Sequence, residues 1–120
     1  MTSPDPPNCL PDVPFEDFRS LDLRVGQVLD AVPFPEARDP AMKLVVDFGP
    51  TIGQLQTSAQ VMDYSTEELL GRPVVGAINL GTKRIAGFQS EFLLLGAVSA
   101  SGSVSLLHPG ESATPGERIA

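Results

Sequence analysis

Hydrophobic and polar residues alternate along several short stretches of the chain, which is the pattern of half-buried β-strands. Residues 42–48 place four large apolar side chains on one face, and the Gly49-Pro50 turn ends the stretch. Residues 52–61 alternate in the same way, with glutamines along one face and Leu55 and Val61 on the other. The pattern predicts two strands joined by a tight turn.

A longer strand is predicted before them, beginning at Leu21 with alternation of apolar and charged residues. Gly26 interrupts this period, so we expect a bulge or a sharp bend at that glycine. Residues 32–40 contain three prolines, and proline has no N–H to donate to a sheet. We therefore expect residues 32–40 to form a loop.

The second half of the chain begins with a helix signal. Ser65 and Glu68 have the spacing of a capping box, and Gly71 provides a stop, which predicts a short helix. Residues 74–80 and 92–98 are apolar on both faces and are predicted to be central strands. Residues 104–107 supply a last strand.

Residues near the N-terminus follow a helical spacing instead. Phe15, Phe18 and Leu21 recur every three residues after Pro14, with acidic residues at the start, which predicts a short amphipathic helical turn. Residues 1–13 are rich in proline and poor in large apolar side chains, so we expect a disordered tail. Residues 14–120 then form a single domain.

This order of elements predicts an all-β protein with short helices. Five short strands, with a helix between the third and the fourth, fit the small Greek-key barrel called the OB-fold, here with a helical turn at its N-terminal end. A β-sandwich is the alternative, because strand spacing alone does not determine whether a sheet closes.

Composition limits the possible functions. The net charge is −7, from eight Lys and Arg against fifteen Asp and Glu, which argues against a general nucleic-acid coat. The chain has neither an apolar run of about 20 residues nor a basic and apolar signal at its start. We expect a soluble, cytoplasmic protein that does not insert into membranes.

Residues for catalysis or metal binding are scarce. The single cysteine, Cys9, and the single histidine, His108, lie far apart in the sequence, so no metal site is expected. No serine stands in a Gly-x-Ser-x-Gly motif, and the glycines match no phosphate-binding loop. The sequence therefore predicts no catalytic residues and no cofactor.

A recognition surface is the remaining possibility. Lys83 and Arg84, the only adjacent basic pair, stand in a stretch bounded by glycines, where we expect a presented loop that contacts phosphates. The other residues that we expect at this RNA-binding surface are two further cations and four polar residues able to bond base edges or riboses: Arg38, Lys43, Ser58, Gln60, Asn79 and Ser90. The alternative is that the basic pair merely keeps a hairpin soluble.

Several of these motifs also resemble one family. Thr57-Ser-Ala-Gln60, Asn79-Leu80 and the stretch from Lys83 to Glu91 are similar to the tRNA-binding domain of CsaA-type export-related chaperones and of methionyl- and phenylalanyl-tRNA synthetases. The resemblance covers roughly residues 15–119 and implies an OB-fold homodimer that binds tRNA without catalysis through the residues named above. It also implies an alternative role, as a chaperone that binds unfolded preproteins or export machinery. Many CsaA-like chains have prolines where Gly81-Thr82 stand here, so we expect a looser loop.

A dimer is also expected from the residues themselves. The stripe of Phe15, Phe18 and Leu21 would leave an apolar patch exposed on a single chain, and a two-fold interface covers it on both copies. These three residues are the predicted dimer interface.

Overall fold

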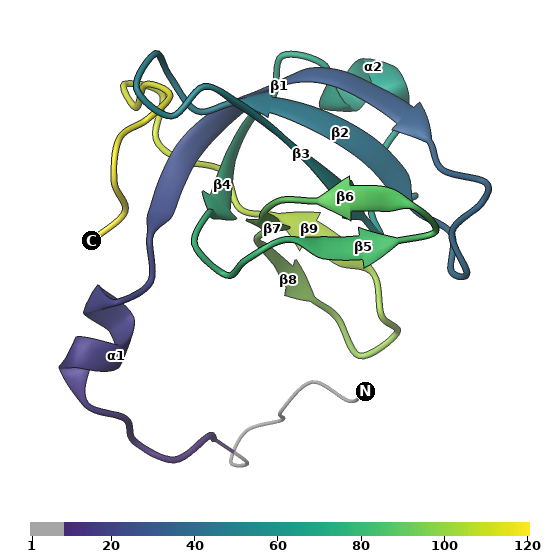
Figure 1. The fold of residues 1–120 in the computed structure, drawn as a ribbon. Helices are drawn as coiled ribbons and strands as arrows, with labels where there is room; N and C mark the ends of the chain where they lie inside the picture. Colours follow the sequence, from purple (N-terminus) through teal and green to yellow (C-terminus); the bar gives the residue numbers. More distant parts are fainter. Residues whose placement is uncertain (1–8) are drawn as a thin grey trace.

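The computed structural model describes residues 9–120. A five-stranded antiparallel sheet, in the order β3-β2-β1-β4-β7, curls into a nearly closed barrel, and two short hairpins accompany it (Figure 1). The strands are β1 (Leu23–Pro33), β2 (Met42–Asp47), β3 (Gln54–Ala59), β4 (Pro73–Ala77), β5 (Lys83–Ile85), β6 (Phe88–Ser90), β7 (Leu93–Leu94), β8 (Gly96–Val98) and β9 (Val104–Leu106). The helices are α1 (Phe15–Arg19) and α2 (Thr66–Leu69). The OB-fold prediction is confirmed.

The core fills the inside of this barrel. The apolar face predicted for residues 42–48 is buried, and Leu44, Val46 and Phe48 are completely inaccessible to solvent. The rings of Phe48 and Phe92 meet edge to face with their centroids 4.9 Å apart. Such aromatic pairs stabilise a core beyond the area that they bury.

The bulge in β1 lies at a different residue from the predicted one. The pairing of β1 with β2 shifts between Val28 and Asp30, whereas Gly26 pairs regularly with Val74 of β4. Gly26 has another role, because a Cβ atom there would lie 2.5 Å from the Cγ1 atom of Val46. Its missing side chain gives core residues of β2 the space that they occupy.

The predicted loop of residues 32–40 is also corrected, since Val32 and Pro33 belong to β1 and pair with Lys43 and Met42. Strand β4 pairs with β1 only over residues 23–27, so the far end of β1 has a strand neighbour on one side only. A proline at such a strand end leaves no ladder partner unsatisfied. The loop begins at Phe34.

Residues 92–98 were predicted to form one central strand. That prediction is wrong, because they are divided between two strands. Residues 93–94 form β7 at the edge of the main sheet, and residues 96–98 form β8, which pairs with β9 in a separate ribbon. Leu93 and Val98 are half-exposed. By contrast, β4 lies between β1 and β7 and is buried, as predicted, although it ends at Ala77.

Both predicted helices form. Ser65 and Glu68 of α2 make the two reciprocal hydrogen bonds of a capping box. Helix α1 precedes β1 and projects away from the barrel (Figure 1). The predicted tail of residues 1–13 lies mostly outside the described residues, and residues 9–13 are exposed without helix or strand. No helix within residues 9–120 is long and apolar enough to cross a membrane.

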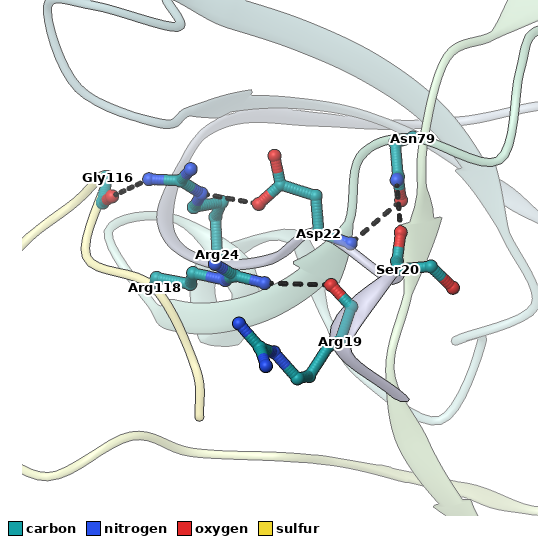
Figure 2. A network of polar contacts seen from close by, with 7 residues as sticks. All are labelled: Arg19, Ser20, Asp22, Arg24, Asn79, Gly116 and Arg118. Atoms are coloured by element: carbon teal, nitrogen blue, oxygen red, sulfur yellow. Dashed lines mark hydrogen bonds and ion pairs between the residues drawn. The ribbon is translucent and has the colours of Figure 1, made fainter. Parts of the chain in front are cut away.

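The end of the chain completes the sheet beside β1. The backbone N–H of Val25 donates to Glu117, Gly116 donates back to Val25, and Ile119 donates to Leu23, at 2.8–2.9 Å. Side chains strengthen this junction (Figure 2): Arg24 donates to Asp22 and to the Gly116 carbonyl, and Arg118 donates to the Arg19 carbonyl. The C-terminal segment therefore fastens α1 and β1 together.

Candidate nucleic-acid interface

Lys83 and Arg84 stand on a strand, which corrects the prediction of a loop. They belong to β5, which pairs with β6 in a hairpin, with Ile85 opposite Phe88. The two residues between them, Ala86 and Gly87, have φ angles of 47° and 81°. Positive φ at both positions is typical of the tightest hairpin turns. The basic pair is therefore held by ladder hydrogen bonds.

The hairpin and the loop that follows β1 enclose a pocket of about 290 Å³, which we call the basic pocket. Five of the eight residues predicted to contact RNA line it, although they come from three separate parts of the chain: Arg38, Ser58, Gln60, Lys83 and Arg84. Asp39 lines it as well, so three cations face one carboxylate. The two ion pairs found within residues 9–120 include none of these cations.

Lys43 lies outside the basic pocket but close to it. Its Nζ atom is 4.5 Å from the centre of the Phe34 ring and 5.1 Å from that of the Phe88 ring. The two rings meet edge to face, 5.4 Å apart. This Phe34–Lys43–Phe88 cluster joins the start of the Arg38 loop to the hairpin that carries Lys83 and Arg84.

Ser90, another predicted contact, is buried where the barrel closes. Its hydroxyl is 2.9 Å from that of Thr57 and accepts a hydrogen bond from the Ser58 backbone N–H. The Thr57 hydroxyl also donates to the Phe92 carbonyl at 2.7 Å. These bonds link β3 to the last residue of β6 and to Phe92 just after the hairpin.

Asn79 lies apart from the basic pocket, beyond the end of β4. Its side-chain oxygen accepts from the Asp22 backbone N–H, and its amide nitrogen donates to the Ser20 carbonyl, both at 2.8 Å (Figure 2). The amide thus holds the connection between α1 and β1. This role could not be predicted from the sequence, because the partners are almost sixty residues away.

A second hollow, of about 430 Å³, continues from the basic pocket, and we call it the apolar groove. It shares four residues with the basic pocket: Ser58, Gln60, Lys83 and Ile85. Its further walls include Leu80, Phe92 and Leu93. Sequence reasoning missed Leu80 and Leu93, because an apolar residue in an apolar run carries no signal that it will be exposed.

The predicted dimer residues form an exposed stripe. Phe15 is 70% exposed, Phe18 38% and Leu21 36%. The rings of Phe15 and Phe18 stack with their centroids 6.2 Å apart. The dimer itself stays a prediction.

A family model described as "Putative tRNA binding domain" matches residues 23–118. Among solved structures, the CsaA chaperone of Bacillus anthracis is 45% identical, with a TM-score of 0.86, and the match covers 92% of this chain and all of that one. The CsaA chaperone protein of Picrophilus torridus is 39% identical, with the same TM-score, over 91% of this chain and all of its own.

Longer proteins contain a similar segment. The methionine–tRNA ligase of Porphyromonas gingivalis is 35% identical over 108 residues, which is 90% of this chain but 16% of the ligase. The chain therefore spans about one-sixth of the length of such ligases.

Proposed function

We propose that this chain, which belongs to the tRNA-binding domain family, binds tRNA without catalysing a reaction on it. The observation that carries the proposal is the convergence of Arg38, Lys83 and Arg84 in one pocket, from two elements that lie far apart in sequence. Ser58 and Gln60 in the same pocket supply groups that bond riboses or base edges.

Charge explains how an acidic protein binds RNA. The net charge of −7 repels phosphates, but salt screens that repulsion at separations beyond about 10 Å. Close to the surface, the three cations of the basic pocket outnumber the one carboxylate beside them. Binding through three phosphate contacts should weaken roughly twentyfold between about 50 and 200 mM salt, from a single-strand slope of about −0.7 per contact.

The test is a filter-binding titration of total tRNA at several salt concentrations, with the wild type and the double variant Lys83→Ala, Arg84→Ala. We expect the double variant to bind more weakly and to lose most of the salt dependence. Arg19→Ala is the matched control, because Arg19 is an exposed cation on α1, away from the basic pocket. A double variant with the salt dependence of the wild type would rule out this site.

We also propose that the chain acts as a homodimer through Phe15, Phe18 and Leu21. Support comes from the exposure of these three residues, two on α1 and one just after it, in a segment that Asn79 and Arg118 fasten to the barrel. Burial of apolar area is worth about 25 cal/mol per Å², so covering several such side chains favours association. Two basic pockets on one assembly would bind a single tRNA with avidity.

A second candidate function is the binding of unfolded polypeptide on its way to export. Two observations favour it: both similar CsaA proteins are described as chaperones, and apolar residues are exposed on and near α1. Apolar binding of this kind would be nearly independent of salt and of the Lys83 and Arg84 substitutions. Titration with a reduced, unfolded protein under the same salt conditions distinguishes it from tRNA binding.

A further inference from the structure

We infer that the apolar groove receives one unpaired base of the bound RNA, while the basic pocket holds an adjoining phosphate. This inference rests on the proposed function and specifies its ligand: RNA in which at least one base is free of its stack. A base within a continuous duplex stays stacked, whereas single strands and loops present bases that a protein can enclose.

The groove has the construction of a base site. Its lining includes Leu80 and Leu93, which are 54% and 52% exposed, and the buried Phe92. Apolar side chains of this kind are suited to packing against the flat faces of a base. A volume of about 430 Å³ lies within the range of small-ligand sites.

The lining of the groove also contains polar groups. Ser58 and Gln60 line it, and the Gln60 amide offers both a donor and an acceptor. Thr57 and Ser90 also line it, but they are buried and bonded to each other and to backbone groups. Their hydroxyls are therefore already paired within the fold, which leaves Ser58 and Gln60 to bond the edge of a base.

Continuity with the basic pocket identifies the occupant. Lys83 lines both hollows, and so do Ser58, Gln60 and Ile85. A ligand that fills both must carry an anion next to a flat, largely apolar group with hydrogen-bonding edges. A nucleotide has this composition, whereas an apolar polypeptide segment would leave the three cations without partners.

The experiment uses the full chain and two RNA probes of equal length and charge. One is an unstructured decamer, and the other is the same decamer with an abasic residue at every position. Each is titrated against the wild type, Leu93→Ala and the control Leu70→Ala, since Leu70 is a half-exposed leucine that lines neither hollow. Leu93 is half-exposed at a sheet edge, so its truncation should leave the fold intact, which circular dichroism checks.

We expect the abasic decamer to bind the wild type at least about fivefold more weakly, the lower end of what one base contact contributes. Leu93→Ala should lose most of this discrimination and keep the salt slope of the wild type, whereas Leu70→Ala should behave as the wild type. Equal binding of the two decamers by the wild type overturns the inference and leaves the proposed function standing, provided that tRNA still binds with the expected salt dependence.

Two further outcomes also contradict the base site. If tRNA binds but neither decamer does, the groove takes no base from a single strand. If Leu93→Ala weakens the binding of a reduced, unfolded protein but not of the intact decamer, the groove belongs to polypeptide. Failure of the wild type to bind any RNA overturns both the inference and the proposed function.

Discussion

The ammonium nitrogen of Lys43 lies 5.1 Å from the centre of the Phe88 ring. Through this contact a residue of β2 reaches the β5–β6 hairpin, and Phe34 completes the cluster from the start of the Arg38 loop. The cluster therefore fixes the distance between Arg38 on one side and Lys83 and Arg84 on the other. Lys43 was predicted to contact RNA, and its position adds a role in holding the pocket together.

Phe88→Ala should weaken tRNA binding about threefold to tenfold, because it removes aromatic and cation–π contacts worth about 0.5–1.5 kcal/mol each. The salt slope should stay that of the wild type, since all the cations remain. Phe88→Tyr should restore affinity, because the ring is kept. Filter binding at several salt concentrations measures both quantities, and an unchanged affinity in Phe88→Ala would show that the cluster does not order the pocket.

Asn79→Ala separates a structural role from an RNA contact. The substitution removes two hydrogen bonds at the α1–β1 junction, so we expect a loss of about 1 kcal/mol in the free energy of unfolding. Urea denaturation measures this loss. The tRNA affinity at a temperature where the variant is folded should be unchanged, and a marked fall in affinity would instead favour the contact predicted from sequence.

Gly26→Ala should destabilise the barrel by about 1–3 kcal/mol, the usual cost of overpacking a core. The added methyl group would lie 2.5 Å from the Cγ1 atom of Val46 and 2.9 Å from the Cε1 atom of Phe48. Gly110→Ala is the control, because a Cβ atom there meets nothing within 4 Å. Thermal unfolding of both variants should show a large decrease in Tm only for Gly26→Ala.

The capping box of α2 should make part of the stability depend on pH. Hydrogen bonds from the backbone N–H and the side chain of Ser65 lower the pKa of Glu68, and the charge of Arg72 lowers it further. A carboxyl whose pKa is lowered by folding stabilises the fold above its unfolded pKa, about 4.3, and loses that contribution as the pH falls through the folded pKa. Glu68→Gln should therefore be less stable than the wild type at pH 7, and the difference should shrink at pH 3. Urea denaturation at both pH values measures it, and a difference that persists at pH 3 would exclude the charge as its cause.

Replacing Phe15 and Phe18 together by Ser should produce monomers. The wild type should have about twice the 12.7 kDa mass of one chain, and the variant should have that of one chain. Light scattering after size-exclusion chromatography measures the masses, and Leu70→Ser is the control for an apolar residue exposed elsewhere. A wild type with the mass of a single chain would disprove the dimer.

Local patterns were sufficient for much of the fold. Alternation over residues 42–48 predicted the buried face of β2, and the spacing of Ser65 and Glu68 predicted the cap of α2. Both predictions depend on residues that lie close together in the sequence. The resemblance to the tRNA-binding family extended this to the whole barrel.

Features that depend on distant partners were predicted less well. Gly26 was predicted to mark a bend. In a sequence, a glycine needed for a turn of the backbone cannot be distinguished from one that leaves space for a neighbouring side chain. The hairpin of Lys83 and Arg84 read as a loop, because Ala86-Gly87 is not the Asn-Gly pair that marks such turns. Asn79 and Ser90 read as free polar groups, since their partners lie more than thirty residues away.

The pairing of Val25 with Gly116 and Glu117 has a consequence for how the protein is made. Synthesis proceeds from the N-terminus at about 5–20 residues per second. The outer edge of residues 23–25 therefore stays uncovered until residues 116–119 have also left the ribosome. During that interval the nascent barrel has an unpaired strand edge, and a chaperone that shields nascent chains would bind to this edge.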